Sequence, residues 1–431
     1  MIIPKAVLNI LTTLETAGYE AFLVGGCVRD LLLGLPPQDF DVCTNAIPDE
    51  MLAVFNDYSV YKTGLKHGTL TVKSDEMFVE VTTYRREGAY FDNRHPNQVE
   101  FISELKQDLA RRDFTVNALA CSKDGEVFDF YGGRTALKEK LITCVGNAEA
   151  RFTEDSLRIL RGLRFAAGYD FTIADETAKA MRKKKHLLKN VSAERIREEL
   201  TKLLVGKAGG KILRNYPDIL LEVLPELSEE ISASALWEET TRVIGNTPAL
   251  PILRWTALLK NSGKVNCLVV DAYSDNHRNS REIAEGVLRR LKFDNKTKKR
   301  IMLLIKYQEV VWEVSDGHIK RLLNQIGEEI LRDLLLLRKA DLNKTDGCYK
   351  KLSDQLAVFE KKLDRIITTK ACFTLKQLAI KGHDLIAVGI VDGKEISSTL
   401  ARLLEAVMDE RCDNNKTALL QFLKENGSVK N

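Results

Sequence analysis

Residues 22–41 read FLVGGCVRDLLLGLPPQDFD, and this segment specifies the architecture of the first part of the chain. An apolar run ends in Gly25-Gly26, and a pattern with helical spacing begins directly afterwards. Paired glycines at a strand-to-helix turn let backbone N–H groups approach phosphate oxygens. Arg29, one turn into the expected helix, could add a guanidinium to a triphosphate. Glycines at such a turn can also serve geometry alone, so a second signal is needed.

That signal is D-F-D at residues 39–41. Alternate residues of a strand share a face, so we expect Asp39 and Asp41 to converge while Phe40 turns into the core. Neighbouring carboxylates repel unless a divalent cation lies between them, and Mg²⁺ binds carboxylate and triphosphate oxygens together. Glu80, between Val79 and Val81, is either a third carboxylate of this site or a solvent-facing strand residue.

Residues 111–118, RRDFTVNA, form a second polar motif. Arg111 and Arg112 could hold phosphate. Asp113 and Asn117 are four apart, so we expect them to share one helix face and to hold the ribose hydroxyls of a nucleotide. The alternative is a buried turn in which Asp113 or Thr115 caps a helix.

Residues 154–161, EDSLRILR, place Asp155 and Arg158 three apart on an expected helix. As a surface ion pair they would contribute little. As a base reader, the carboxylate would accept from the exocyclic amine of cytosine or adenine, and the guanidinium would donate to the ring nitrogen. Uracil and guanine present the reverse pattern, which such a pair would reject.

The chain changes character near residue 146. Strand signals occupy residues 22–26, 69–72, 78–84 and 127–133, whereas amphipathic helices follow almost without interruption. We therefore expect an α+β head followed by a helical remainder.

The net charge is only +4, but residues 146–210 hold 14 Lys and Arg against 9 Asp and Glu. The basic cluster in this segment is either a solvated helix face or an RNA-phosphate contact; its members are Arg182, Lys183, Lys184 and Lys185. Eight scattered cysteines without C-x-x-C, the lack of signal-peptide order in the first residues, and no apolar run of about 20 residues predict a cytoplasmic protein with no membrane partner.

The four motifs occur in order, and together they resemble the class II tRNA nucleotidyltransferases, or CCA-adding enzymes, and the related bacterial poly(A) polymerases. The resemblance implies a polymerase-β-like head, two Mg²⁺ ions, and a neck that serves as a template for CTP and ATP at the 3′ end of tRNA. It implies that Asp39 and Asp41 are the catalytic metal ligands. Nucleotide contacts are implied for Gly25, Gly26, Arg29, Arg112, Asp113, Asn117, Asp155, Arg158, Arg161 and Arg164.

The resemblance also implies four parts, with the head at 1–145 and the neck at 146–205. A helical body at 206–345 and a tRNA-binding tail at 346–431 would follow. The body resembles an HD-type scaffold in which Lys260 and Asn261 replace the metal-binding His-Asp pair, so we expect no phosphohydrolase activity. His277 and His318 are expected to be structural. In the tail, glycines at 382, 389 and 393 mark turns before a helix at 395–410.

Three alternatives remain open at this level: a poly(A) polymerase, an enzyme that adds only the final A, and an inactive RNA-binding protein. Residues 84–98 resemble the loop that family members need for switching from C to A, which disfavours an enzyme adding only CC. Residues 63–72, TGLKHGTLTV, resemble the CCA-adding version of their strand, whereas poly(A) polymerases have a more basic run there. Oligomeric state does not follow from the sequence.

Overall fold

The computed structural model describes residues 2–87, 99–264, 273–342 and 347–426, without side chains for 87, 99, 273–278 and 347–349. The chain forms two compact units. The first is Met1–Gly245 with Gly286–Phe293, and the second is Asn246–Glu285 with Asp294–Asn431. This division is coarser than the four parts expected from the sequence, which therefore remain a prediction.

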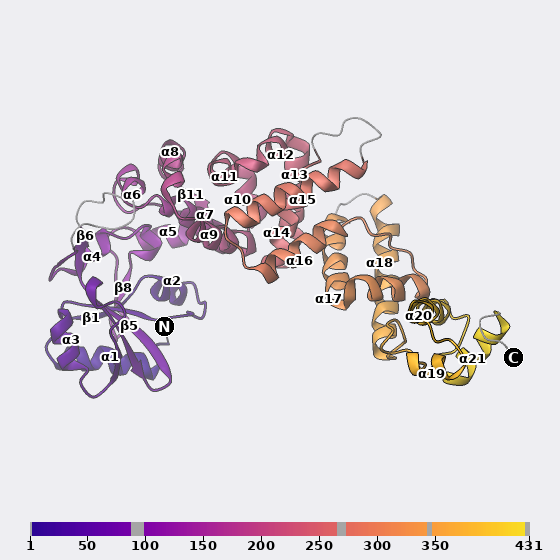
Figure 1. The fold of residues 1–431 in the computed structure, drawn as a ribbon. Coiled ribbons are helices and arrows are strands. Elements are labelled where there is room, and N and C mark those ends of the chain that lie inside the picture. The colour runs from indigo at the N-terminus through magenta and orange to yellow at the C-terminus, as the bar shows by residue number, and fades with distance from the viewer. Residues whose placement is uncertain (1, 88–98, 265–272, 343–346, 427–431) are drawn as a thin grey trace. The chain divides into compact units, whose positions relative to one another are not determined.

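A seven-stranded sheet is the centre of the first unit (Figure 1). Its order is β3-β4-β5-β2-β1-β8-β9, and all neighbours are antiparallel except β2 and β5. The strands are β1 (Ala21–Val24), β2 (Asp41–Thr44), β3 (Ser59–Tyr61), β4 (Thr69–Ser74), β5 (Met77–Thr83), β8 (Ala120–Cys121) and β9 (Val127–Phe128). The α+β head expected from the sequence is confirmed.

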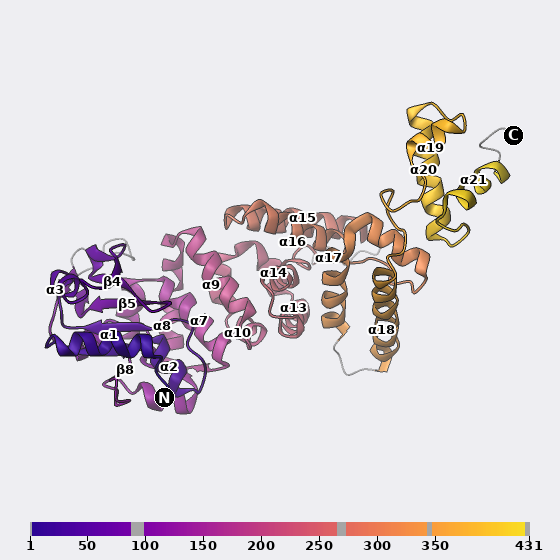
Figure 2. The same cartoon turned by 90° about the horizontal axis from the view of Figure 1, so that it is seen from below.

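One face of this sheet is covered and part of the other is open. Burial alternates along β4 and β5, so Leu70, Val72, Val79 and Val81 are buried while their neighbours are more exposed. The helix α1 (Lys5–Thr16) runs along the sheet and contributes its own buried stripe (Figure 2). The open face of β4 and β5 is therefore available to a ligand.

Two small sheets extend the first unit. The hairpin β6 (Arg85–Glu87) with β7 (Val99–Phe101) flanks residues 88–98, so most of the expected switching loop lies outside the described residues. The strand β11 (Thr172–Ile173) pairs in parallel with β10 (Leu141–Ile142). The sequence did not predict β11, because a two-residue strand leaves no periodic pattern.

The remaining elements of the first unit are short helices. They are α2 (Gly26–Leu32), α3 (Pro48–Val54), η1 (Leu65–His67), α4 (Leu105–Ala110), η2 (Thr115–Asn117), α5 (Gly133–Glu139), α6 (Ala148–Glu154), α7 (Leu157–Tyr169), α8 (Asp175–Lys184), η3 (Lys185–Asn190), α9 (Ala193–Val205), α10 (Gly209–Asn215), α11 (Pro217–Val223), η4 (Pro225–Leu227), α12 (Ser228–Ser232) and α13 (Ser234–Asn246). Among them, α7 and α9 pack closely together and carry many of the polar residues discussed below.

The described part of the second unit is helical. Its helices are α14 (Pro251–Leu259), α15 (Tyr273–Arg290, whose end lies in the first unit), α16 (Asn295–Lys306), α17 (Asp316–Leu342), α18 (Gly347–Thr368), α19 (Gly382–Ala387), α20 (Gly393–Met408) and α21 (Lys416–Glu425). Gly327, at φ +80, interrupts α17. The predicted turns are confirmed, because Gly382 and Gly393 begin helices and Gly389 adopts φ +94.

Candidate active site

An open cavity of about 520 Å³ in the first unit brings the sequence motifs together. It is lined by both aspartates of D-F-D and by all ten expected nucleotide-contact residues, with Arg111, Leu157, Phe165 and Arg195 in addition. The lining contains seven arginines against four aspartates. A net positive lining of this kind suits a polyanion such as a nucleoside triphosphate.

The glycine turn brings backbone close to an arginine. Gly25 adopts φ +80, and a Cβ placed there would lie 2.8 Å from Nη1 of Arg112. A Cβ on Gly26 would lie 3.4 Å from Nη2 of Arg29. Gly25 is thus required both by its backbone conformation and by the approach of Arg112.

The two aspartates of D-F-D reach the cavity, but not as alternate residues of one strand. The strand β2 begins at Asp41, and Asp39 lies in the bend before it. Phe40 is buried, as expected. The strand prediction for Asp39 was therefore wrong. Both side chains nevertheless line the cavity, because the chain enters the sheet at this edge of it.

Like charges gather around Asp41. Burial first, and then the charges of Asp39 and Glu80, raise the pKa of Asp41 to about 6, while Arg112 lowers it. Glu80 is the register partner of Asp41 across β2 and β5, and its side chain is exposed. No hydrogen bond or ion pair reaches the carboxylate of Asp39 or Asp41 from the described residues. A carboxylate pair with this excess of negative charge fits a divalent cation.

The described structure does not group Glu80 with Asp39 and Asp41 as a third metal ligand. In the described parts of the chain, no three His, Cys, Asp or Glu side chains are grouped closely enough to hold a metal ion. A cation at this edge would rest on Asp39, Asp41 and oxygens of the substrate.

Asp113 and Asn117 meet directly, although not on an α-helix. The helix α4 ends at Ala110, and only the 3₁₀ turn η2 follows, so the predicted helix face is wrong. Asn117 Nδ2 donates to Asp113 Oδ1 at 3.1 Å, and the N–H of Phe114 donates to the same oxygen at 2.9 Å. The carboxylate therefore competes for backbone N–H groups and stabilises a turn rather than a helix.

Arg161 neutralises Asp113 from the helix α7. Its Nε and Nη2 lie 2.7 and 2.6 Å from Asp113 Oδ2. Burial alone would raise the pKa of Asp113, but the Arg161 charge and the Asn117 hydrogen bond lower it to about 2. Asp113 is therefore ionised at neutral pH and holds Arg161 in place.

Arg29 is more enclosed than the sequence suggested. Its guanidinium donates to Asn117 Oδ1 at 2.5 Å and to both carboxylate oxygens of Asp30. It also lies over the ring of Tyr169, 4.6 Å from the centroid. Arg29 thus orients Asn117 at the wall of the cavity.

Phe165 is a shared platform for arginines. Its ring lies 4.2 Å from the guanidinium carbon of Arg164, 5.3 Å from that of Arg29 and 5.4 Å from that of Arg161. Cation–π contacts of this kind hold guanidinium groups without neutralising them. The sequence analysis missed Phe165, because an aromatic residue on a helix is usually part of the core.

Asp155 and Arg158 also differ from expectation. Asp155 lies between α6 and α7 in an extended conformation, so the two residues do not share one helix. Asp155 Oδ1 accepts from the N–H of Leu157 at 3.0 Å, and Arg195 donates to Oδ2 at 2.9 Å. Arg158 pairs with Glu154 at 2.6 Å. The two side chains line the same cavity, each held by its own partner.

Arg195 and Asp108 are functional candidates that sequence reasoning missed. Arg195 is 40 residues from Asp155, and nothing in its helical segment marks the pairing. Asp108 is buried and lies 2.9 Å from Arg111 Nη2 and 3.6 Å from Arg112 Nη2. R-R following an acidic residue is a weak signal that could have suggested this arrangement.

The basic cluster 182–185 lies outside the cavity, and each member has an acidic neighbour. Lys183 and Lys184 pair with Glu149, at 2.7 and 3.9 Å. Arg182 and Lys185 lie near Asp218, at 3.6 and 3.4 Å. These contacts link α8 and η3 to α6 and α11, so each of the four side chains has an acidic partner on a neighbouring helix.

The position in the second unit that the sequence suggests is HD-like holds an ion pair. Lys260 and Asn261 are buried, and the ammonium of Lys260 contacts Asp341. His318 Nε2 lies 2.8 Å from the Val311 carbonyl oxygen. The side chain of His277 lies outside the described residues.

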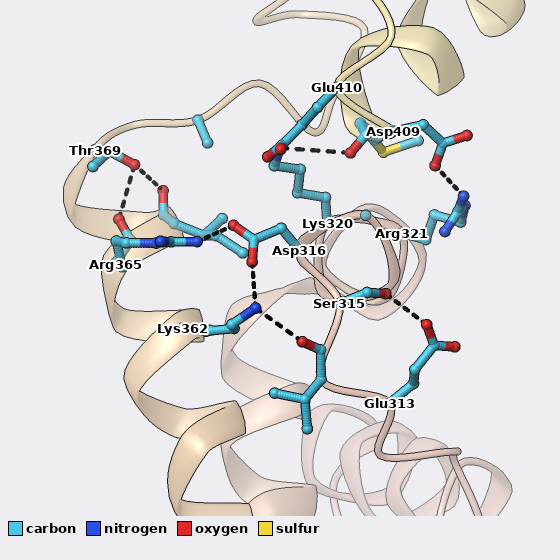
Figure 3. A pocket seen from close by; sticks show the side chains of 15 residues that line it. Glu313, Ser315, Asp316, Lys320, Arg321, Lys362, Arg365, Thr369, Asp409 and Glu410 are labelled. Atoms are coloured by element: carbon cyan, nitrogen blue, oxygen red, sulfur yellow. Dashed lines mark hydrogen bonds and ion pairs between the residues drawn. The ribbon is translucent and has the colours of Figure 1, made fainter. Parts of the chain in front are cut away.

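A larger cavity, of about 890 Å³, lies in the second unit among α17, α18 and the end of α20 (Figure 3). Its charges are paired: Asp316 accepts from Lys362 at 3.0 Å and contacts Arg365, and Lys320 contacts Glu410 at 3.0 Å. Arg321 contacts Asp409. A cavity whose charges are paired with one another resembles an interface between packed helices more than a binding site for a polyanion.

None of the helices in the described part of the chain has the length and apolar character needed to cross a membrane.

Three family models match the chain in succession. The model of the poly A polymerase head domain matches residues 21–143, and that of a probable RNA and SrmB-binding site of polymerase A matches residues 170–231. The model of tRNA nucleotidyltransferase domain 2 matches residues 274–423.

Whole-length relatives agree with these matches. The CCA-adding enzyme of Lactobacillus delbrueckii subsp. bulgaricus is 34% identical over 430 residues, covering 96% of either chain. The structure of the Bacillus stearothermophilus CCA-adding enzyme in complex with CTP is 28% identical, with a TM-score of 0.75, and covers 99% of this chain and 98% of that one. The Thermotoga maritima CCA-adding enzyme complexed with tRNA-CCA shares the fold, with a TM-score of 0.64 at 20% identity.

Proposed function

This chain belongs to the family of CCA-adding enzymes, and we propose how its own residues add C, C and A to the 3′ end of tRNA. CTP and ATP are the substrates, and pyrophosphate is released. The observation that carries the proposal is one arginine-rich cavity that is lined by the carboxylates of Asp39 and Asp41 and also by Asp155 and Arg158, the proposed base-reading pair.

Nucleotidyltransferases of this kind generally use divalent metal ions. We propose that Asp39 and Asp41 hold two Mg²⁺ ions, which when bound lower the pKa of the RNA 3′-hydroxyl and neutralise the departing pyrophosphate. Burial and the nearby negative charges of Asp39 and Glu80, which together raise the pKa of Asp41, support this assignment. In this proposal Glu80 contributes negative charge. Whether it also binds a metal ion is tested by the substitution Glu80→Gln.

The triphosphate is proposed to lie against the Gly25-Gly26 turn and Arg112. Arg112 is held towards this turn by Asp108, and the missing Cβ of Gly25 leaves room for it. Guanidinium groups fixed in this way bind phosphate oxygens with little loss of side-chain entropy. Arg161 and Arg164 add positive charge from α7, oriented by Asp113 and Phe165.

The sugar is proposed to contact Asn117, with Asp113 behind it. Arg29 and Asp113 fix the orientation of the Asn117 amide through hydrogen bonds to its oxygen and its nitrogen. A fixed amide can hydrogen-bond a ribose hydroxyl and so favour ribonucleotides over deoxyribonucleotides.

The base is proposed to be read by Asp155 and Arg158. Arg195 and Glu154 hold these side chains, so the carboxylate and the guanidinium are presented in fixed positions. Cytosine and adenine satisfy both groups, whereas uracil and guanine would leave like partners facing each other.

We propose that the four-part organisation with boundaries near 145, 205 and 345 serves tRNA binding, with the tail at 346–431 on the tRNA. Contact of residues 182–185 with RNA phosphates is supported by the family model that covers residues 170–231. A cytoplasmic location is supported by the six free cysteines of the described chain.

The test uses three tRNA transcripts, ending at the discriminator base, in C, and in CC. Each is incubated with the protein, Mg²⁺, and CTP, ATP or both, and products are resolved at single-nucleotide length. Three additions to the shortest transcript, with both nucleotides required and a stop thereafter, are expected. A single A on the CC transcript alone would identify a final-A enzyme, long A tails would identify a poly(A) polymerase, and no addition would overturn the proposal.

A further inference from the structure

A row of side chains crosses four adjacent strands on the open face of the sheet. Asp41 on β2 is the register partner of Glu80 on β5, Glu80 pairs with Thr71 on β4, and Thr71 pairs with Tyr61 on β3. Register partners in a sheet point to the same face. The row therefore connects the carboxylate edge of the active site to the outer strand without a break.

Tyr61 ends this row on β3, and its ring contacts that of Phe78 on β5. Phe78 is two residues before Glu80 and so shares its face, and its ring centroid lies 5.8 Å from that of Tyr61 in an edge-on arrangement. The two side chains are 57% and 49% exposed. The opposite face of β4 and β5 is the buried one, so these rings do not belong to the core. A paired, exposed aromatic surface beside a catalytic edge is typical of a binding surface.

The surroundings of the pair suit a nucleic acid. Lys73 is the register partner of Phe78, and its contact with Glu76 spans 3.6 Å with the glutamate 96% exposed. Such a surface pair is weak, so the ammonium can exchange Glu76 for a phosphate. Aromatic rings next to a cation are the usual combination for binding single-stranded nucleic acid by stacking.

We propose that Tyr61 and Phe78 form a stacking platform for the unpaired 3′ end of the RNA, upstream of the reacting hydroxyl. The inference rests on the proposed function, because it requires the RNA 3′ end to be near Asp41. Three strand spacings separate the strands of Asp41 and Tyr61, about 14 Å, which is the rise of about four stacked nucleotides. The platform would hold the end of the acceptor in line with the carboxylates while the nucleotide enters the cavity.

The experiment uses a full-length tRNA transcript ending in CC, with 2-aminopurine at the discriminator position. The double variant Tyr61→Leu/Phe78→Leu keeps apolar side chains but removes the rings, and Tyr61→Phe/Phe78→Tyr keeps both rings. Phe130→Leu is the matched control, because Phe130 is 45% exposed just after β9, the opposite edge strand of the same sheet.

For the leucine double variant, we expect KM for the RNA to rise about tenfold or more, the scale of one base–aromatic contact. KM for ATP and kcat at saturating RNA should stay near wild type. The 2-aminopurine fluorescence, quenched by stacking on the wild-type protein, should recover in this variant. The ring-preserving variant and Phe130→Leu should behave like wild type.

Unchanged KM for RNA and unchanged quenching in the leucine double variant would overturn the platform and leave only a cross-strand packing pair. An equal rise in KM for Phe130→Leu, or a loss confined to kcat, would also overturn it. These results are distinct from failure of the proposed function, in which the wild-type protein itself would add no nucleotide to any transcript.

Discussion

Arg161 and Asp113 form an ion pair although they are 48 positions apart in the sequence. Nε and Nη2 of Arg161 lie 2.7 and 2.6 Å from Oδ2 of Asp113. This pair joins the RRDFTVNA turn of the head to the helix α7, which also carries Arg158 and Arg164 of the cavity lining. It fixes the wall of the cavity on which the proposed nucleotide contacts depend.

The pair predicts a specific pH dependence of stability. The folded pKa of Asp113, about 2, lies below its unfolded value of about 3.9, so the stabilisation is present above about pH 4 and is lost as the pH falls towards 2. Asp113→Asn should lower the free energy of unfolding by about 2 kcal/mol at pH 7, and the difference from wild type should shrink below pH 4. Urea unfolding at several pH values measures it.

Asp170→Asn is the matched control for that measurement. Asp170 pairs with Lys211 at 3.0 Å, but its side chain is 40% exposed, and asparagine tolerates its φ of +54. Its effect should be several-fold smaller. Equal effects of the two substitutions, or an Asp113 effect that does not change with pH, would contradict the buried pair.

The carboxylate pair predicts loss of chemistry without loss of binding architecture. Asp39→Ala or Asp41→Ala should lower kcat by at least about a thousandfold, because the proposed metal ions lose a ligand. Single-turnover addition to a CC-ending tRNA, with circular dichroism as a check of folding, measures this. Glu80→Gln in the same assay shows whether Glu80 binds a metal ion or only adds a negative charge near Asp41. Turnover close to wild type for Asp41→Ala would refute the assignment.

The glycine turn predicts an effect on triphosphate binding. Gly25→Ala places a Cβ 2.8 Å from Arg112 Nη1 and should raise KM for both CTP and ATP about tenfold or more, beyond the strain of φ +80. Gly34→Ala isolates the strain, because Gly34 has φ +70 and no atom within 4 Å of the added Cβ. A Gly34 variant with the same KM change would show that strain, not Arg112, is responsible.

The base-reading pair predicts a change of selectivity. Asp155→Ala or Arg158→Ala should reduce the preference for CTP and ATP over UTP and GTP by at least about a hundredfold, since the rejected bases no longer face like partners. Arg195→Ala should have a smaller effect of the same sign, because it frees Asp155 without removing it. Misincorporation assays with each nucleotide alone measure this. Unaltered selectivity in Asp155→Ala would end the template interpretation.

The Lys260–Asp341 contact predicts that the proposed HD-like body has no phosphohydrolase activity. The purified protein should show no metal-dependent hydrolysis of 2′,3′-cyclic phosphates, because an ammonium stands where a metal ligand would be needed. Lys260→Met should destabilise the second unit, because it removes the buried ion pair with Asp341, and should leave nucleotide addition rates unchanged. Detectable hydrolysis with Mn²⁺, Mg²⁺ or Ni²⁺ would contradict this account.

Local patterns predicted the elements well where the signal was periodic. Alternation marked β4 and β5, glycines marked the turn before α2, and the tail turns fell at the expected residues. The errors occurred at aspartates. Asp113 and Asp155 each accept a hydrogen bond from a backbone N–H one or two residues later, and this ends or displaces a helix that spacing alone would continue.

The amino-acid sequence alone therefore determined which carboxylates, arginines and glycines are available for the chemistry. It also determined on which short segments these residues lie. Their partners depend on the folded chain. Arg195 holds Asp155 across 40 residues, Arg29 holds Asn117 across 88, and Tyr169 donates to Asp30 across 139. Periodicity shows on which face of its helix or strand a side chain lies. An ion pair or a stacked guanidinium depends also on which faces of different elements pack together. Those faces meet only in the folded chain, where α7 packs against α9 and α2 packs against η2.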